Sequence, residues 1–169
     1  MPRLWAGWRI PYILAENDTR SLGNPSALTL FEGIEQSGLD DSVTYILWRG
    51  KHCFALLNAY PYTSGHLMVL PKKGVANLED LDDDTYVELF EGVRMGISAV
   101  KNEYQPDGVN MGMNLGSASG AGVPDHIHVH VLPRWAGDTN FLTSVAEARV
   151  LPESLGDTWQ RLKNAWPET

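Results

Sequence analysis

Residues 110–141 read NMGMNLGSASGAGVPDHIHVHVLPRWAGDTNF, and three of the five histidines of the chain fall in HIHVHVL at 126–132. Successive side chains of a strand point to opposite faces, so His126, His128 and His130 should share one face and their β-branched neighbours the other. At a rise of about 3.3 Å per residue the rings would stand about 6.6 Å apart, a spacing that suits adjacent phosphates of a polyphosphate. The pattern predicts a strand with one core face and one face for chemistry.

A glycine-rich stretch lies directly before the histidines. Residues 116–122 read GSASGAG, and such small side chains leave the backbone free to turn its N–H groups toward an anion. A glycine-rich loop alone is weak evidence for anion binding, so its weight comes from its place beside the alternating histidines. Together the two features predict chemistry on phosphate groups.

A metal site or a structural role could also account for the three histidines. Histidine is the commonest metal ligand, and two histidines two residues apart on a strand can form half of a zinc site. Such a site recruits a further Cys, His, Asp or Glu, and a glycine-rich anion loop has no part in it. A structural role is the remaining alternative, and it is the role that we expect for the isolated His52.

The segment HIHVHVL resembles the signature of the histidine triad (HIT) superfamily, which is His-x-His-x-His followed by two hydrophobic residues. The resemblance extends to LNAYPYTSGHLMVLP at 57–71, VLPRWAGDTNF at 131–141 and VLPESLGDTWQRLKNAW at 150–166. These segments are most similar to the bacterial HIT proteins that act as diadenosine tetraphosphate phosphorylases, and they share features with the fragile histidine triad branch. The likeness is nearly continuous from residue 45 to residue 166.

The resemblance implies a reaction for the middle histidine. Attack on phosphorus needs a nucleophile that is uncharged at pH 7, and imidazole, with a reference pKa of about 6.5, supplies one. In the family the residue matching His128 forms a nucleotidyl-histidine intermediate. For its Nε2 to attack, Nδ1 must donate the ring proton to a fixed acceptor, and we expect a backbone carbonyl there. Orthophosphate as the second acceptor gives phosphorolysis, and water gives hydrolysis; the resemblance favours phosphorolysis.

The resemblance also assigns roles to residues around His128. His126 and His130 would bind phosphate oxygens or tune the nucleophile, and Asn114 would donate to the phosphate. Asn58 would bind the ribose hydroxyls, unless its amide only caps a turn. The remaining residues with an implied role are Leu56, Leu57 and Met68 in the base pocket, His66 at the border of the active site, Trp135 closing over it or packing at a dimer edge, and Ser119, Gly120, Ala121 and Gly122 offering N–H groups to phosphate.

The chain departs from the family pattern at two places. Many members carry Gln followed by Ser or Thr before the triad, whereas this chain has Gly122 and Val123, and Val123 offers no hydroxyl. Either Ser117, Ser119 and the loop backbone take over that role, or the leaving group needs little protonation. This departure favours a polyphosphate leaving group over an amine, and hence dinucleoside polyphosphates over nucleoside phosphoramidates. Close relatives often carry a Cys-x-x-Cys pair near residues 25–37, and its absence here argues against a structural zinc.

Composition restricts the other classes of function. The formal net charge of −8 argues against a protein that holds nucleic acid by neutralising many phosphates. The single cysteine, Cys53, excludes an internal disulfide framework and reads as a small buried hydrophobe. No apolar run of about 18 residues and no cleavable leader are present, so we expect a cytoplasmic protein without membrane contact.

The periodicities predict an α+β protein, and the resemblance implies the HIT-like form of that fold. We expect an antiparallel sheet with strands at 43–48, 52–58, 66–71, 109–115 and 126–132, one long helix ending before Pro106, a C-terminal helix at 155–166 and a short helix at 25–37. One globular domain should comprise an N-terminal arm with the short helix, residues 1–42, and a HIT domain, residues 43–169.

The resemblance also implies how the protein is assembled and what it binds. Family members are generally homodimers, so we expect a homodimer that binds a small nucleotide. No cofactor should be required, and Mg²⁺ or Mn²⁺ could accompany the polyphosphate substrate. A nucleotide-binding module without catalysis is the alternative from a different class, and the complete triad argues against it.

Overall fold

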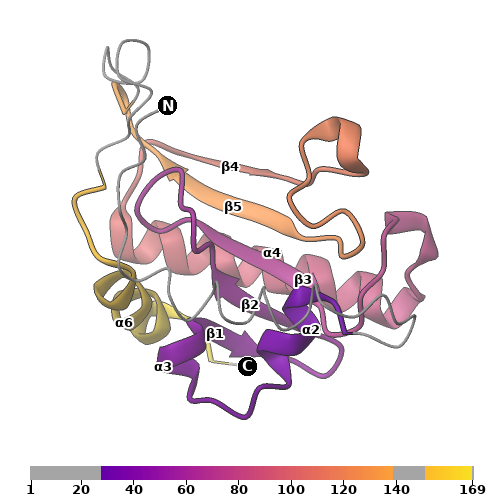
Figure 1. Cartoon of the computed structure of the whole chain (residues 1–169). Coiled ribbons are helices and arrows are strands. Elements are labelled where there is room, and N and C mark those ends of the chain that lie inside the picture. The colour runs from indigo at the N-terminus through magenta and orange to yellow at the C-terminus, as the bar shows by residue number, and fades with distance from the viewer. Residues whose placement is uncertain (1–27, 139–150, 169) are drawn as a thin grey trace, which may run out of the picture.

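The computed structural model describes residues 28–138 and 151–168 (Figure 1). Within these residues five strands form one antiparallel sheet in the order β1-β2-β3-β5-β4. The strands are β1 (Ile46–Arg49), β2 (Cys53–Leu57), β3 (Leu67–Pro71), β4 (Gly108–Gly112) and β5 (Val129–Arg134). The α+β class and the five-stranded antiparallel sheet predicted from the sequence are confirmed.

The sheet buries apolar side chains on both faces. Alternation along each strand sends Ala55, Val69 and Val129 to one face, where they join the larger core cluster. Phe54 and Leu70 point the other way, into a second and smaller cluster. The central strands therefore read as continuous apolar runs, as expected of strands covered on both sides.

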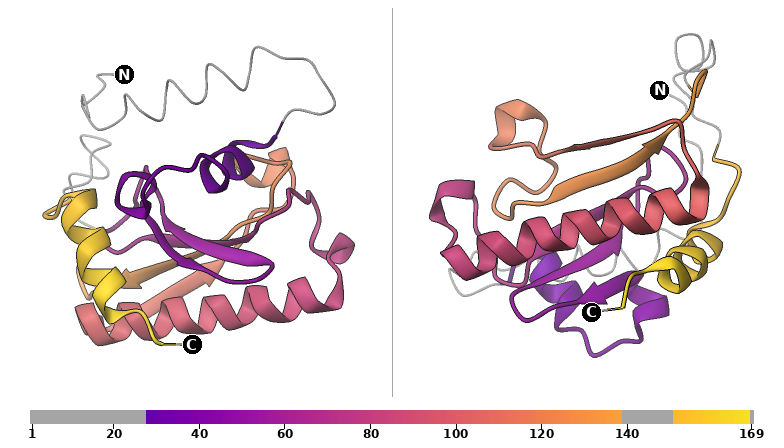
Figure 2. Two further views of the ribbon diagram at one scale, coloured as in Figure 1. Left: turned by 90° about the horizontal axis from the view of Figure 1, so that it is seen from below. Right: turned by 180° about the vertical axis from the view of Figure 1, so that it is seen from behind.

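One long helix, α4 (Asp83–Tyr104), covers the face of the larger cluster (Figure 2). Asp82 caps its start by accepting the N–H of Thr85, and Gln105 ends it in the left-handed conformation. Gly92 and Gly96 face the sheet, where a Cβ on Gly92 would lie 2.8 Å from Cγ1 of Val69. The helix can therefore lie close to the strands only because these two positions lack side chains.

A second helix, α6 (Leu155–Ala165), packs against α4 and β1. Leu162 is fully buried in the larger cluster, and the indole Nε1 of Trp159 donates to the main-chain oxygen of Ile46 at 2.9 Å. Ser154 caps its first turn. The predicted C-terminal helix is thus confirmed, one residue shorter than expected because Trp166 already has an extended backbone.

The opposite face of the sheet carries α2 (Leu30–Glu35), as the left view of Figure 2 makes plain. Its Phe31 is buried in the smaller cluster. The predicted start at Asn24 and Pro25 lies outside the described residues. Within them the helix begins after the capping box of Thr29 and Glu32 and ends sooner than the predicted residue 37.

Three of the predicted strands each differ by three residues at one boundary. Val43 and Thr44 belong to a single helical turn, α3 (Asp41–Thr44), which Asp40 caps and Tyr45 closes with a φ of 56°. The fourth strand begins at Gly108 and ends at Gly112, before the predicted residue 115. The triad strand begins only at Val129, because the N–H of His126 bonds to Val123 and that of Ile127 to Val75.

Short 3-10 turns, η2 (Leu78–Asp80) and η3 (Ser117–Ser119), complete the described elements. Among the described residues no helix is long and apolar enough to cross a membrane. Most of the expected N-terminal arm lies outside the described residues, and the division at residue 42 stays a prediction.

Candidate active site

The three histidines of the triad lie on the same face of the sheet, as predicted. The ring centroids of His128 and His130 are 4.9 Å apart, and Phe31 of α2 contacts both His126 and His128, at 5.4 and 5.3 Å. Ile127, the residue between two of them, belongs to the core cluster on the α4 side. The predicted separation of the histidines from the core residues between them is confirmed, although only His130 lies within β5 itself.

One ring nitrogen of His128 is engaged in a hydrogen bond, and within the described residues no hydrogen bond engages the other. Its Nδ1 lies 2.8 Å from the main-chain oxygen of His126, which can only accept, so Nδ1 carries the proton. Burial lowers the pKa of His128 below its ordinary value, so the ring is neutral at pH 7 and its Nε2 keeps a lone pair. The predicted carbonyl partner is therefore present, and it belongs to the first histidine of the triad.

His126 is fully buried, with both ring nitrogens engaged. Nε2 donates to the main-chain oxygen of Pro71 at 2.8 Å, and Nδ1 lies 2.7 Å from the hydroxyl of Thr29. Burial lowers the pKa of His126, so the neutral ring accepts the hydroxyl proton at Nδ1. The expectation that His126 binds phosphate oxygens is corrected, because no ring atom is left for a ligand; its other expected role, tuning the nucleophile, remains open.

His130 forms a hydrogen-bonded pair with His66, which directly precedes β3. The N–H of Tyr62 donates to Nδ1 of His66 at 3.1 Å, so the proton of that ring is on Nε2. Nε2 of His66 then donates to Nδ1 of His130 at 3.0 Å, which leaves the proton of His130 on its own Nε2. Burial lowers the pKa of His130 to about 4, in keeping with a neutral ring that offers one N–H donor.

The predicted base pocket is divided between the two faces of the sheet. Met68 pairs with His130 across the strands and lies in the smaller cluster with Leu56, on the face of the histidines. Leu57 lies in the larger cluster against α4, so the expectation that it lines the pocket is corrected. The reason is the alternation of β2, which sends neighbouring residues to opposite faces.

Asn58 caps a turn at the end of β2. Its side-chain oxygen accepts the N–H of Tyr60 at 2.8 Å, and its Nδ2 lies 3.5 Å from Nε2 of His66. The turn-capping alternative is therefore observed. The amide is also next to the histidines, so its expected contact with a ribose stays a prediction.

The glycine-rich loop joins β4 to β5 at the same end of the sheet as the triad (Figure 1). The N–H groups of Ser119 and Gly120 bond within the loop, to the oxygens of Gly116 and Ser117, and this corrects the expectation that all four predicted N–H groups are free. No such bond engages the N–H groups of Ala121 and Gly122 within the described residues. The N–H groups available to a phosphate are thus those of Ala121 and Gly122, the second half of the predicted set.

Asn114 and Val123 flank this loop. Asn114 is half-buried and makes no side-chain hydrogen bond within the described parts of the chain, so its amide is available to a ligand. Val123 packs against the smaller apolar cluster. The residue that replaces the hydroxyl of other members therefore serves packing.

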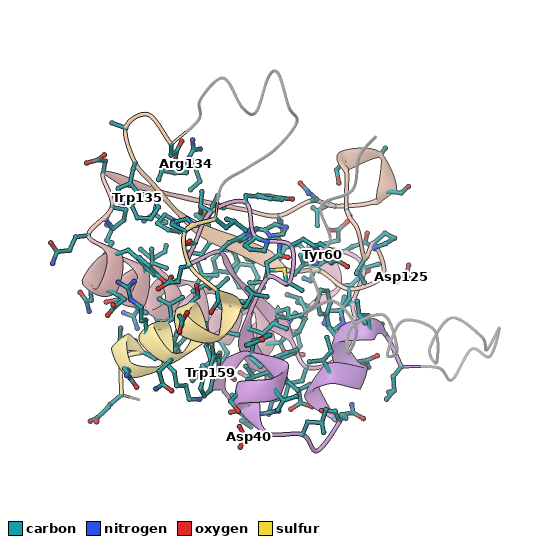
Figure 3. All side chains as sticks on the ribbon, turned by 60° about the vertical axis from the view of Figure 1, so that its left-hand side comes forward. Asp40, Tyr60, Asp125, Arg134, Trp135 and Trp159 are labelled. Carbon is teal, nitrogen blue, oxygen red and sulfur yellow. The ribbon has the colours of Figure 1, made fainter. Side chains whose placement is uncertain are left out.

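Trp135 lies far from the triad. Figure 3 shows it beside Arg134 at the end of β5 opposite to Asp125, and seven residues of extended chain separate it from His128 by about 23 Å. Its ring meets Tyr104 edge-on at 6.2 Å. Its two expected roles, closing over the active site and packing at a dimer edge, stay predictions.

Sequence reasoning missed three residues that contact the histidines, namely Thr29, Phe31 and Tyr62. The ring of Tyr62 is exposed and lies 4.6 Å from that of His66 and 6.1 Å from that of His130. An aromatic residue four positions before a site histidine was a usable signal for Tyr62. No local signal pointed to Thr29 and Phe31, because their contacts depend on how a distant helix docks.

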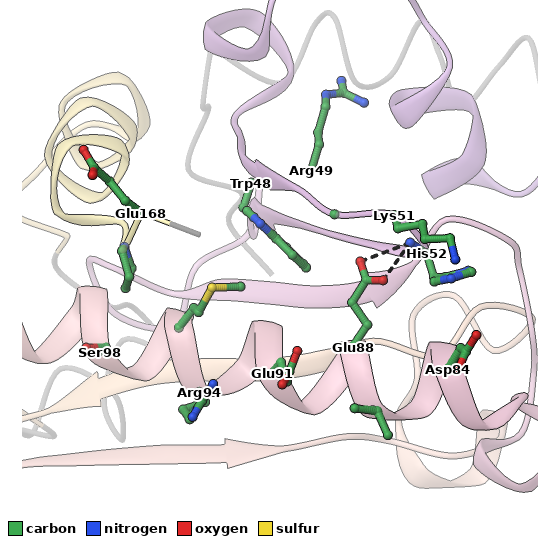
Figure 4. A pocket seen from close by; sticks show the side chains of 14 residues that line it. Trp48, Arg49, Lys51, His52, Asp84, Glu88, Glu91, Arg94, Ser98 and Glu168 are labelled. Atoms are coloured by element: carbon green, nitrogen blue, oxygen red, sulfur yellow. Dashed lines mark hydrogen bonds between the residues drawn. The ribbon is translucent and has the colours of Figure 1, made fainter.

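A groove of about 980 Å³ lies apart from these histidines, between the β1–β2 hairpin and α4 (Figure 4). Glu88 crosses it to accept the N–H groups of His52 and Cys53, at 3.0 and 3.2 Å. Burial raises the pKa of Cys53 to about 12, in keeping with the predicted role of a buried hydrophobe. Within the described residues no group of three or more His, Cys, Asp or Glu is arranged to hold a metal ion.

The fold and the site together define a class: an α+β domain that presents a neutral imidazole beside a glycine-rich loop. The chain belongs to the HIT domain family, which matches residues 41–137. A Mycobacterium tuberculosis protein named AP-4-A phosphorylase is 41% identical over 166 residues, covering 98% of this chain and 85% of that protein.

Two further relatives are more distant. The Schizosaccharomyces pombe protein named bis(5'-nucleosyl)-tetraphosphatase (asymmetrical) is 32% identical over 93 residues, which are 55% of this chain and 50% of that protein. The crystal structure of a HIT-like protein involved in cell-cycle regulation from Bartonella henselae superposes with a TM-score of 0.66 at 25% identity, covering 81% of this chain and 95% of that one. These likenesses support the HIT fold of the chain.

Proposed function

We propose that the protein cleaves dinucleoside polyphosphates such as diadenosine tetraphosphate, with His128 as the nucleophile and orthophosphate as the final acceptor. The observation that carries this proposal is the hydrogen bond from Nδ1 of His128 to the oxygen of His126, which leaves Nε2 as a fixed, neutral lone pair. The similarity over nearly the whole chain to a protein named AP-4-A phosphorylase supports the choice of substrate and acceptor.

The reaction has two displacements. Nε2 of His128 attacks the α-phosphorus of one nucleotide, the P–O bond to the rest of the chain breaks, and ATP leaves with the bonding electrons. An oxygen of orthophosphate then attacks the phosphorus of the nucleotidyl-histidine, the N–P bond breaks, and ADP forms. Covalent catalysis of this kind replaces one difficult displacement by two easier ones.

Neutral donors around His128 would stabilise the phosphate oxygens. Nε2 of His130, the amide of Asn114 and the N–H groups of Ala121 and Gly122 are the donors that we assign to this role. A well-placed donor contributes about 3 kcal/mol to such a transition state. We propose no resident metal, and Mg²⁺ or Mn²⁺ would arrive with the polyphosphate, whose charge it offsets.

The packing of Val123 favours polyphosphates over phosphoramidates. Val123 packs against the smaller cluster and offers no hydroxyl to protonate the leaving group, and an amine needs that proton to depart. A polyphosphate chain is acidic enough to leave as an anion. We therefore expect nucleoside phosphoramidates to be poor substrates.

The decisive experiment follows the label of ³²P-orthophosphate during turnover of diadenosine tetraphosphate. Phosphorolysis places the label in ADP, whereas an unlabelled nucleotide product would make the enzyme a hydrolase, as the name of the Schizosaccharomyces pombe relative suggests for that protein. His128→Ala should abolish turnover and keep nucleotide binding, with His52→Ala as the matched control outside the site. Full activity of His128→Ala would contradict the proposal.

We also propose a homodimer in the cytoplasm. β4 ends the sheet, its residues 110–112 are exposed, and no strand pairs with its outer edge within the described residues, so a second copy could continue the sheet there. Sedimentation of the full chain should give twice the mass of 18.7 kDa. A monomer at micromolar concentration would refute this part of the proposal.

A further inference from the structure

One hydroxyl joins the first turn of α2 to the triad. Oγ1 of Thr29 accepts the N–H of Glu32 at 3.3 Å as the N-cap of the helix, and its own proton faces Nδ1 of His126 at 2.7 Å. That nitrogen must accept, because Nε2 of the same neutral ring donates to Pro71. The group that starts the helix therefore also fixes the first histidine.

Glu32 and Gly74 hold this hydroxyl in place. The carboxylate of Glu32 accepts the N–H of Thr29 at 2.6 Å and that of Gly74 at 2.9 Å, and so ties α2 to the loop after β3. A Cβ on Gly74 would lie 2.6 Å from Cγ2 of Thr29 and 3.4 Å from Nδ1 of His126. Residue 74 must therefore be a glycine because a side chain would not fit there. Its backbone conformation is one that any residue can adopt.

We propose that Thr29 is a positioning residue for the nucleophile and acts through His126. The route is short: the hydroxyl of Thr29 anchors the ring of His126, and the main-chain oxygen of His126 anchors Nδ1 of His128. Thr29 precedes residue 41, where the match to the HIT family begins. The effect on turnover rests on the proposed function, whereas the effect on the His128 hydrogen bond does not.

The burial of His126 makes the anchor hard to replace. The ring is fully buried, so solvent cannot supply a donor to Nδ1 when the hydroxyl is lost. The ring and its main chain would then shift, and the carbonyl would no longer aim at His128. A displacement of 1 Å in a reacting group can lower the rate about a hundredfold.

The test uses the full chain with three variants and one control. Thr29→Val keeps the shape and removes the hydroxyl. Gly74→Ala keeps every hydrogen-bonding group and presses a methyl group against Cγ2 of Thr29, and adding Thr29→Ser to it removes that Cγ2. Ser154→Ala removes the equivalent cap of α6, which touches no histidine, and so measures the effect of losing a cap alone.

Two quantities are measured in each variant. Steady-state kinetics with diadenosine tetraphosphate gives kcat and KM, and NMR of ¹⁵N-histidine-labelled protein without substrate follows the Nδ1–H proton of His128. We expect Thr29→Val and Gly74→Ala to lower kcat about tenfold or more with little change in KM, and to broaden or shift this resonance. The double variant should recover most of both, and Ser154→Ala should change neither.

Three outcomes would overturn the inference. They are an unchanged kcat in Thr29→Val, an unchanged His128 resonance in a variant that lost activity, and an equal loss of kcat in Ser154→Ala. If the wild-type protein does not turn over the substrate, the proposed function fails and the resonance alone decides the inference. If Thr29→Val does not fold, Gly74→Ala and its double variant decide it.

Discussion

The position of each ring proton can be assigned residue by residue in this site. The sequence predicted that Nδ1 of His128 donates to a carbonyl, and the structure confirms it with the oxygen of His126. The pair of His66 and His130 could not be predicted, because it depends on the register that brings two strands together. Spacing along the chain tells which face a side chain takes but not which partner it meets.

His66 should control the tautomer of His130. Replacing it in His66→Phe keeps an aromatic ring but removes the donor to Nδ1 of His130, so the proton can move there and leave a bare Nε2 facing phosphate oxygens. We expect kcat/KM to fall at least about tenfold. This loss is smaller than that for a general acid or base, because His66 acts only through His130. Equal kcat/KM in His66→Phe and in the control His52→Phe would contradict this assignment.

The value of kcat/KM should stay constant down to a pH below 6.5, the ordinary pKa of histidine. Protonation of His128 removes the nucleophilic lone pair, and burial lowers its pKa below 6.5. The acid limb of the profile of kcat/KM against pH should therefore lie below pH 6.5 and fall as the pH decreases. A limb centred above that pH would mean that a group other than His128 governs the reaction.

At the scale of elements, periodicity predicted where the long helix lies along the chain. It did not predict which segments a short helix packs against. The apolar positions of α4 recur every three or four residues and identify its buried face, and Asp82 and Gln105 bound it as capping rules require. The same reasoning could not place α2 over the histidines, because a six-residue helix carries too short a pattern. Its docking depends on Phe31, whose partners are nearly a hundred residues away.

The glycines of α4 set how closely it lies on the sheet. Gly92→Ala should destabilise the protein by about 1–3 kcal/mol, although alanine favours helices, because the new methyl group meets Cγ1 of the buried Val69 at 2.8 Å. Gly96→Ala is the matched control with the milder contact, since its methyl group would meet the end of the Leu67 side chain at 3.0 Å and Trp166 at 3.5 Å. Urea unfolding measures both, and equal midpoints would contradict the argument.

At the scale of the whole molecule, the family resemblance predicted the topology of the sheet. The alternation of residues predicted which face of the sheet each side chain occupies. What it could not supply were contacts between distant segments, such as Trp159 on the main chain of Ile46 or Thr29 on His126. It also could not predict that the ring of Trp135 meets Tyr104 edge-on, because this contact joins the chain after β5 to the end of α4. Local sequence patterns predict the helices and strands, whereas the contacts between distant segments depend on tertiary packing.

The buried histidines should make folding stability depend on pH. All three triad residues have a pKa lowered by burial, to about 4 for His130, so between this value and 6.5 the unfolded chain binds more protons than the folded one. Stability should therefore decrease as the pH falls through this window. His130→Asn should show a shallower decrease in urea midpoints measured across it, and an identical slope would refute the assignment.

The smallest helix on the histidine face gives the enzyme a thermal weak point. α2 has six residues and a single buried side chain, Phe31, so its local opening should require far less free energy than melting of the sheet behind it. Warming would then release the first histidine while β2, β3 and β5 stay folded. Catalysis should fade at a temperature where circular dichroism still reports an intact protein, and cooling should restore it without refolding.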